Sequence, residues 1–204
     1  MRKRRSDSGT ATIEIIFQCL EEVANEEGLD GLSMREVARR AEIALASLQR
    51  YFPTKASLLS AFVDRSVEKY KERVSRLQEG GGTKDTFETI VRFAAQETLS
   101  ISNGGILSMI ESRIDRDEVC KQCFRSLMSS YLSLLIEAIA RRFPELNEND
   151  VQRSAIVICS FLEGLPTAVF AAETFNFTAD SVVNDVVSQA VQVPALISFK
   201  SGQA

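Results

Sequence analysis

Residues 33–55, SMREVARRAEIALASLQRYFPTK, constrain the fold more than any other stretch of the 204-residue chain. Ser33 and Glu36 have the S-x-x-E spacing of a capping box, in which the hydroxyl accepts from the Glu36 amide and the Glu36 side chain returns to the Ser33 amide. Apolar residues at helical spacing follow, and Pro53 ends a second helix because proline cannot occupy a helix interior. The stretch predicts two short helices joined by a tight turn, with a third opening behind them.

The second of these helices begins near Ala44 and turns Ile43, Leu48 and Phe52 inward. Small or polar side chains remain on its outer side or rim: Ala44, Ser47, Gln49, Arg50 and Tyr51. Two short helices of which the second presents such side chains form a helix-turn-helix, whose second helix fits the major groove of B-DNA.

Three of the outer residues suit direct contact with bases. Arginine pairs bidentately with guanine, glutamine with adenine, and serine with several base edges. We therefore predict base-edge contacts from Ser47, Gln49 and Arg50. The alternative is that the same helix face is merely solvated.

From Ile16 to Leu59 the chain resembles the N-terminal domain of the TetR family of bacterial transcriptional regulators. The matching pieces are EEGLDGLS, then MREVARRA, then I-x-x-x-S-L-x-R-YF-P-x-K-x-x-LL, with YFPTKASLL the most specific. The resemblance covers about the first 65 residues; the remainder resembles the family only in being helical and of similar length.

Two positions depart from the family pattern. Glu42 stands where the family usually has a turn glycine, so either Glu42 is left-handed at a cost of about 1 kcal/mol or the turn is altered. Ala24 stands where phenylalanine is common, which predicts a core repacked by Phe17.

The resemblance also implies contacts with phosphates. Tyr51 and Lys55 match the family's phosphate contacts, as does Ser33 at a helix N-terminus, where an exposed amide can hold an anion. Arg35 would contact a base or a phosphate. For these four residues a surface position without a role in DNA binding is the alternative.

Apolar spacing predicts an all-α chain. A first helix over about residues 10–27 stops at Gly28, and the basic residues 1–9 form an arm that is unstructured until DNA orders it, or a terminus with incidental charge. Further helices are predicted over about 54–78, 83–100, 105–114, 117–143, 149–173 and 178–193 or a little beyond. We place a helix-turn-helix domain at residues 1–55 and a helical ligand-binding and dimerisation domain at residues 56–204.

Residues 155–172 are apolar almost all round, and residues 182–191 carry a second apolar stripe rich in valine. A helix that is apolar on every face must be buried on every face. Because this is more surface than one core can use, we predict a homodimer that pairs the last two helices in a four-helix bundle.

The resemblance further implies an effector cavity within residues 83–175, mostly apolar and suited to a hydrophobic or amphipathic molecule. Its candidate lining residues are mainly aromatic or thioether side chains with a few polar groups: Phe93, Gln96, Glu97, Met109, Arg113, Phe124, Met128, Tyr131 and Phe161. Plain core packing is the alternative for each. Arg113 would pair with an effector anion, or equally with Glu111 or Asp117.

Histidine is absent, which removes the imidazole base, the Ser-His and Cys-His nucleophiles and His-ligated metals. We therefore expect no enzyme, catalytic residue, cofactor or metal, and a helical enzyme would need coupled carboxylates such as Glu97 and Glu111. Cys120 and Cys123 lack a second pair or a histidine for a structural metal site. They are core or surface thiols, or alternatively a thiol switch.

The net charge of −4 argues against a nucleic-acid partner, but its distribution softens the objection: residues 1–55 hold nine basic and nine acidic residues, and residues 56–204 hold fifteen and nineteen. We find no secretory signal after MRKRR and no apolar run near the ~18 residues of a membrane helix. The sequence predicts a cytoplasmic, effector-responsive DNA-binding regulator, a repressor that binds a palindromic operator and no membrane. The rival is a ligand- or protein-binding module of the same fold without specific DNA recognition, which Glu42 and the acidic balance favour.

Overall fold

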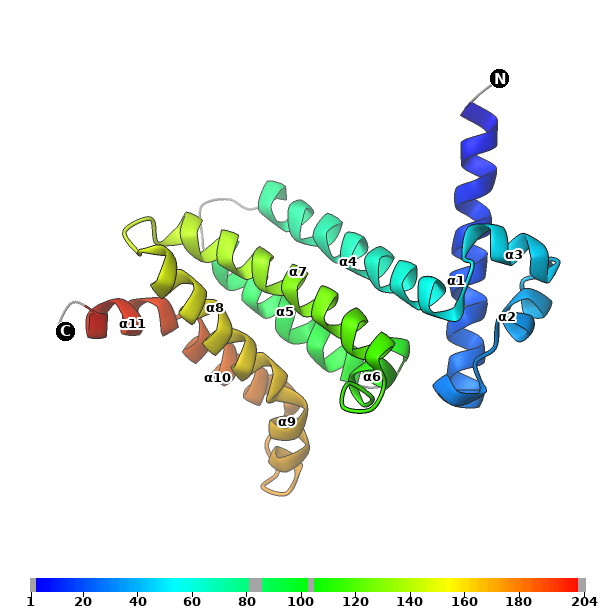
Figure 1. The fold of residues 1–204 in the computed structure, drawn as a ribbon. Helices are drawn as coiled ribbons and strands as arrows, with labels where there is room; N and C mark the ends of the chain where they lie inside the picture. The colour runs from blue at the N-terminus through cyan, green and yellow to red at the C-terminus, as the bar shows by residue number, and fades with distance from the viewer. Residues whose placement is uncertain (1–2, 81–85, 103–104, 202–204) are drawn as a thin grey trace. The chain divides into compact units, whose positions relative to one another are not determined.

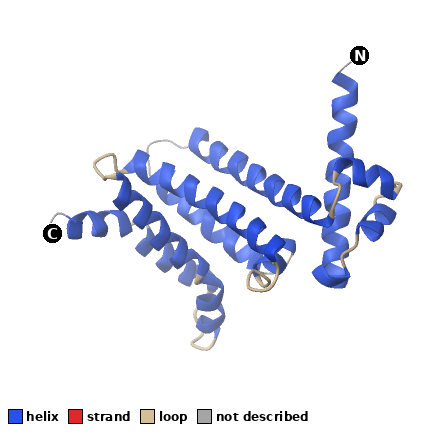
Figure 2. Cartoon of the chain, viewed as in Figure 1, coloured by secondary structure: helices blue, strands red, loops and turns tan. Residues whose placement is uncertain are grey.

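The computed structural model describes residues 3–80, 86–102 and 105–201, and within them the regular structure is helical throughout (Figure 1, Figure 2). The predicted all-α fold is therefore confirmed. In chain order the helices are α1 (Lys3–Gly31), α2 (Met34–Arg40), α3 (Leu45–Tyr51), α4 (Lys55–Gly80), α5 (Thr86–Ser102), α6 (Ile106–Glu111), α7 (Glu118–Arg142), α8 (Glu148–Glu163), α9 (Leu165–Glu173), α10 (Ala179–Ala190) and α11 (Val193–Ser201).

The chain divides into two compact units. Unit 1 comprises Met1–Ser66 and Asn103–Leu127, and unit 2 comprises Val67–Ser102 and Met128–Ala204. The helices α4 and α7 each begin in unit 1 and end in unit 2. Compactness thus groups α6 with the N-terminal helices, whereas a functional boundary between residues 55 and 56 stays a prediction.

Unit 1 is built on α1. The helices α2 and α3 lie on the same side of α1 (Figure 1), and α6 also packs against it. Buried apolar side chains from α1 and α3, including Ile16, Leu20 and Leu48, fill the space between the helices. Hydrophobic burial on this inner side leaves the outer side of α3 available for contacts.

Unit 2 has one core shared by α4, α5 and α7 to α11. Within it α10 packs against α9, and α11 packs against α8. Val183, Val187 and Ala190 on α10 are buried in this core. Part of the valine stripe predicted to lie in a subunit interface therefore serves the core of its own unit.

Two predicted boundaries were wrong. α1 starts at Lys3, so residues 3–9 are helical, because Lys and Arg favour helix and extending an existing helix is easier than nucleating one. The predicted helix 149–173 is two helices, since Pro166 at the start of α9 has no amide to continue the ladder past Gly164. Residues 1–2 of the arm and the predicted helix start at residue 83 lie outside the described residues.

Three helical stretches of the described residues are long and apolar enough to cross a membrane, judged by length and composition alone. They are Glu118–Arg142, Glu148–Glu173 and Ala179–Phe199. This differs from the expectation drawn from uninterrupted apolar runs, because stretches that contain a few polar residues also reach the required mean hydropathy.

Candidate nucleic-acid interface

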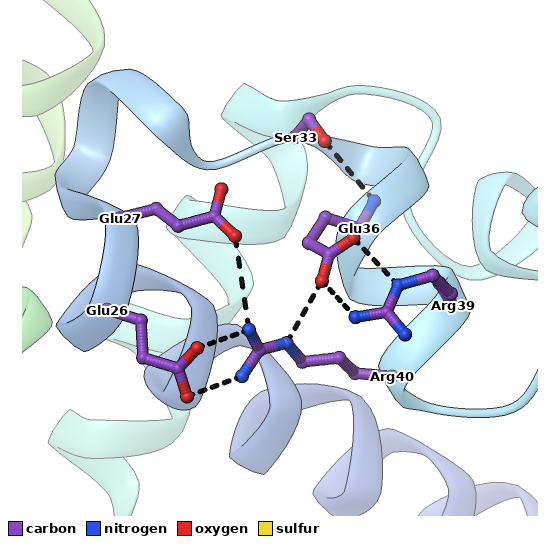
Figure 3. Close-up of polar contacts among 6 residues, drawn as sticks. All are labelled: Glu26, Glu27, Ser33, Glu36, Arg39 and Arg40. Carbon is purple, nitrogen blue, oxygen red and sulfur yellow. Dashed lines mark hydrogen bonds and ion pairs between the residues drawn. The ribbon is translucent and has the colours of Figure 1, made fainter.

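The start of α2 is fixed by Ser33, whose hydroxyl accepts from the Glu36 amide at 3.2 Å. This half of the predicted capping box is confirmed. The other predicted bond of the capping box, from the Ser33 amide to the Glu36 side chain, is replaced. The Glu36 carboxylate accepts from Arg39 and Arg40 on its own helix (Figure 3). Guanidinium groups three and four residues along are positively charged donors, so they attract the carboxylate more strongly than the neutral Ser33 amide does.

Arg40 fastens α2 to α1. Its guanidinium donates to Glu26 Oε1 at 2.8 Å and to Glu36 Oε1 at 3.1 Å, and Glu27 lies 3.9 Å away (Figure 3). Hydrogen bonds from Arg39 and then Arg40 lower the pKa of Glu36 from 4.5 to about 2. The side chain of Arg40 is only 18% exposed, so it positions the helices and is not presented to a partner.

The turn between α2 and α3 contains Glu42, which stands where the TetR family usually has glycine. Its φ is 53°, in the left-handed region. The Glu42 amide donates to Arg39 O at 3.2 Å, and the Ile43 amide donates to Ala38 O at 3.0 Å. This is the Schellman pattern, which requires a left-handed residue at the first position after the cap. Of the two alternatives for Glu42, the structure takes the left-handed one.

The inner side of α3 is anchored by aromatic packing. Leu48 and Phe52 are buried as predicted, and Ile43 is half-buried. The Phe17 ring contacts those of Phe52 and Phe62, with centroids 5.6 and 5.7 Å away. Phe17 thus lies at the centre of the core that supports α3, as the alanine at position 24 predicted.

The outer side of α3 is polar and open. Ala44, Gln49, Arg50 and Tyr51 are exposed, Ser47 is half-buried, and Arg50 Nη2 lies 3.4 Å from Ser47 Oγ. An open hollow of about 440 Å³ adjoins this face, lined by Thr12, Ile43, Ser47, Arg50 and Tyr51. The residues predicted to read bases therefore share one solvent-facing surface. Thr12 was missed, because only the fold brings position 12 beside α3.

The other predicted DNA contacts lie around this face in unit 1. Arg35 is exposed on α2, and the Ser33 hydroxyl is used as a helix cap. Lys55 Nζ donates to Leu29 O at 2.5 Å, which ties the start of α4 to the end of α1. A phosphate contact by Lys55 would therefore involve an ammonium group that is already anchored.

The predicted effector residues fall in both units. Phe93, Gln96, Glu97, Met128, Tyr131 and Phe161 lie in unit 2, whereas Met109, Arg113 and Phe124 lie in unit 1. In unit 2 the ring of Tyr70, which was not among the predicted lining residues, lies 5.0 Å from Phe93 and 4.5 Å from Tyr131. Tyr70 lies on α4, Phe93 on α5 and Tyr131 on α7, so sequence spacing alone does not show that the three rings are in contact.

Charged groups adjoin the same aromatic cluster in unit 2. Arg73 lies over the Phe93 ring at 4.5 Å and pairs with Glu97 at 2.7 Å. Burial, and then the charge of Glu97, raise the pKa of Tyr131 to about 12. The cluster thus combines apolar rings with two hydroxyls and an ion pair.

The side-chain ion pair of Arg113 is with Asp30 and not with the predicted Glu111 or Asp117. This pair, at the end of α1, is bidentate, with Nη2 2.8 Å from Oδ2. Hydrogen bonding to Arg113, and then its charge, lower the pKa of Asp30. Both residues belong to unit 1, so the segment that follows α6 is fastened to the helix-turn-helix scaffold.

Cys120 and Cys123 are buried, and burial raises the pKa of both thiols, that of Cys120 to about 11. A thiol of high pKa holds little reactive thiolate, so core packing describes this pair better than a thiol switch. No group of three potential metal ligands occurs among the described residues.

The sequence of this region matches a known family. The family described as "Bacterial regulatory proteins, tetR family" matches residues 19–62. The chain is 34% identical over 100 residues to the transcriptional repressor DrrR1 of Streptomyces coeruleorubidus, covering 49% of this chain and 35% of that protein. It is 38% identical over 61 residues to the transcriptional repressor KstR of Mycolicibacterium smegmatis, covering 30% of each.

The chain thus spans about a third of the length of these two relatives. A solved structure extends the likeness of fold to nearly the whole chain. A TetR-family transcriptional regulator from Syntrophomonas wolfei superimposes with a TM-score of 0.73 at 12% identity, covering 92% of this chain and 96% of that one. These relatives are transcriptional regulators and not enzymes.

Proposed function

Because residues 19–62 of this chain match the tetR family of bacterial regulatory proteins, we propose that the chain is a cytoplasmic, homodimeric repressor. It binds a palindromic operator and releases it when a small hydrophobic or amphipathic molecule binds the C-terminal domain. The observation that carries this proposal is the exposed polar face of α3, held on a buried aromatic core.

The proposal assigns distinct roles to the residues of this face. Ser47, Gln49 and Arg50 contact base edges beside Ala44, which is small enough to let the helix approach the duplex. Ser33, Tyr51 and Lys55 bind phosphates, and Arg35 contacts a base or a phosphate. In a dimer, two such helices about 34–36 Å apart would enter successive major grooves on one face of the duplex.

Dimerisation is supported by apolar side chains that unit 2 leaves exposed. They lie on α8, α9, the turn after α9, and α11: Ile156, Val157, Phe161, Phe170, Phe175, Phe177, Leu196 and Phe199. Large exposed apolar patches mark interaction sites. A second copy of the chain would cover these exposed apolar side chains, so the apolar helices need no membrane to bury them.

Effector response is supported by two features. The aromatic cluster of unit 2, with its ion pair, has the mixture of apolar and polar groups that small-molecule sites use. The Arg113–Asp30 pair couples the segment after α6 to the reading helices within unit 1. An effector would release DNA only through its differential affinity for the two arrangements of the protein.

A salt series of gel-shift measurements tests the proposal. The purified dimer should bind the DNA upstream of its own gene, and affinity should fall steeply between 50 and 200 mM salt. Gln49→Ala should cost about 1–3 kcal/mol of specific binding, a loss confined to the base pair that Gln49 reads. Gln189→Ala, at an exposed glutamine on α10, is the matched control and should change nothing.

The rival is a ligand- or protein-binding module of the same fold. Glu42 favours it, because this exposed acid sits in the turn next to the reading helix. Binding that is weak, independent of sequence and unaffected by Gln49→Ala would decide for the rival.

A further inference from the structure

The aromatic cluster of unit 2 already holds a positive charge, which the chain itself supplies. The guanidinium of Arg73, on α4, lies over the Phe93 ring with Cζ 4.5 Å from the ring centroid, and its Nη1 is 2.7 Å from Glu97 Oε1. The face of an aromatic ring is electronegative, so a ring face and a carboxylate that meet at one point attract a cation. Phe93 and Glu97, both on α5, thus form a cation site that Arg73 occupies.

The Phe93 ring is held in place by two further rings. The Tyr70 ring contacts it from α4 and also contacts Tyr131 on α7, with centroids 5.0 and 4.5 Å away. Tyr70 and Phe93 are 6% and 8% exposed, so packing fixes both rings before any ligand binds. Aromatic side chains arranged around a carboxylate suit quaternary ammonium groups and protonated amines.

The charges around these rings favour a cation over an anion. Burial, and then the charges of Glu97 and Glu163, raise the pKa of Tyr131 to about 12, so two carboxylates act on this ring. Burial is also the main cause of the raised pKa of Tyr70, and the charge of Arg73 opposes that rise. Two acids act here against one base, and a further anion would meet repulsion.

Arg73 can leave the cation site at small cost. Its side chain is 50% exposed, whereas that of Glu97 is 24% exposed. An ion pair with one half-exposed partner contributes little to stability, because water readily replaces that partner. The long stem of arginine also allows the guanidinium to turn into solvent. Its departure would open a space of about the size of an ammonium head group, beside both Phe93 and Glu97.

We infer that the effector is an organic cation, an amine or a quaternary ammonium compound, whose charged group replaces the Arg73 guanidinium between Phe93 and Glu97. The inference rests on the proposed function and names the chemical class of its effector. The exchange also removes a bond between α4 and α5. Because α4 starts four residues after the end of α3, the helix that carries Arg73 also supports the reading helix.

The first test measures ligand class on the full-length protein without DNA. Three probes have nearly the same shape: the cation benzyltrimethylammonium, its neutral isostere neopentylbenzene, and the anion phenylmethanesulfonate. At constant ionic strength the cation should raise the Tm followed by circular dichroism, and the other two should not. Equal shifts from the cation and the neutral isostere, or a shift from the anion alone, would overturn the inference.

The second test locates the site by calorimetric titration with benzyltrimethylammonium. Glu97→Gln keeps the shape and removes the charge, and should weaken binding about tenfold. Phe93→Leu keeps an apolar side chain without a ring face, and should weaken binding about threefold. Glu88→Gln, on the same helix and also at an acid paired with an arginine, is the matched control and should leave the affinity unchanged. Equal affinity of all four proteins would overturn the inference.

Arg73 provides the sharpest result, because a competitor and a structural residue act in opposite directions. Arg73→Ala should tighten binding of benzyltrimethylammonium about threefold to tenfold, since the cation no longer has to displace a group of the protein. Arg73→Gln, which keeps a long polar side chain without the charge, should also tighten it. Unchanged or weaker binding in both variants would overturn the inference. Circular dichroism without the probe checks that each variant is folded.

The third test joins the site to the regulatory role, using a duplex that the protein selects from a random pool. Saturating benzyltrimethylammonium should weaken duplex binding by the wild type about fivefold or more, compared with an equal concentration of NaCl, and should not do so for Glu97→Gln. Unchanged duplex affinity with the cation bound would overturn the effector role. A protein that selects a duplex and does not bind the cation would overturn the inference alone. A protein that selects no duplex would overturn the proposed function, whereas the cation site would stand or fall by the first two tests.

Discussion

The helices α1–α3 and the helices α8–α11 differ in how many of their large apolar side chains are exposed to solvent. In the first region Leu48 is fully buried, and most of the exposed side chains of α3 are small or polar. In the second, Phe170 is 77% exposed and Phe175 is 70% exposed, although both regions lie in units with a buried core. The first region buries most of its large apolar side chains within its own unit, whereas the second leaves several of them exposed.

The difference indicates which kind of partner each region requires. A polar face with arginine and glutamine suits a hydrated, charged ligand that binds and leaves, as DNA does. Eight apolar side chains that expose roughly 100 Å² each approach the ~800 Å² per partner of a stable protein interface. α10 contributes little to this surface, since its outward residues include the polar Asn184, Asp185, Ser188 and Gln189.

The largest expected effect is on assembly. Ile156→Glu combined with Phe161→Glu places two charges on the exposed apolar face of α8, and should raise the dissociation constant of the dimer at least 100-fold, about 1.5–3 kcal/mol per lost apolar contact. Sedimentation velocity over a range of concentrations measures it. Ser188→Glu on the polar face of α10 is the control and should leave the dimer intact. A double variant that still dimerises would show that this face has another role.

The same contrast explains how much of the molecule the sequence predicts. The cap at Ser33, the left-handed alternative for Glu42 and the inward Leu48 and Phe52 follow from spacings within a few residues, and the structure has them all. Contacts between distant positions could not be predicted from spacing: Arg40 with Glu26, Arg113 with Asp30, and Thr12 beside α3. They depend on how helices pack. The surplus of apolar surface within residues 155–172 was predicted, but the particular side chains of α8 that are exposed were not, because an apolar helix has the same sequence pattern in a core and in an interface.

The two left-handed turns give a second, smaller contrast. Glu42 after α2 and Asn176 after α9 have φ of 53° and 60° and the same pair of hydrogen bonds. Asparagine tolerates this conformation and glutamate does not, so Glu42→Gly should stabilise the protein by up to about 1 kcal/mol.

For Asn176→Gly we expect a change within about 0.5 kcal/mol. Urea unfolding midpoints of the two glycine variants measure the difference. Equal gains at both turns would mean that the α2–α3 turn carries no extra strain.

The Arg113–Asp30 pair tests whether polar contacts fasten the N-terminal region. Arg113→Ala should raise hydrogen exchange of the amides at residues 29–32 about twofold to fivefold, a modest effect because the Asp30 side chain is largely exposed. Adding 1 M NaCl to the wild type should act in the same direction, since salt screens exposed charges. Arg125→Ala, at an exposed arginine on α7, is the control. Exchange on α8 should respond to neither change.

The smallest expected effect is the response of the α1–α2 contact to acid. The folded-state pKa of Glu36 is about 2, below its usual 4.5, so its contribution to stability is complete above about pH 4.5 and is lost as the pH falls toward 2. The stability difference between wild type and Glu36→Gln, measured by urea unfolding, should therefore shrink between pH 4.5 and 3. Thr178→Ala removes a neutral cap from α10, costs about 1 kcal/mol and should show a difference that does not vary over this range. A constant difference for Glu36→Gln as well would mean that its bonds to Arg39 and Arg40 add nothing to folding, and that the N-terminal region too is held by apolar packing alone.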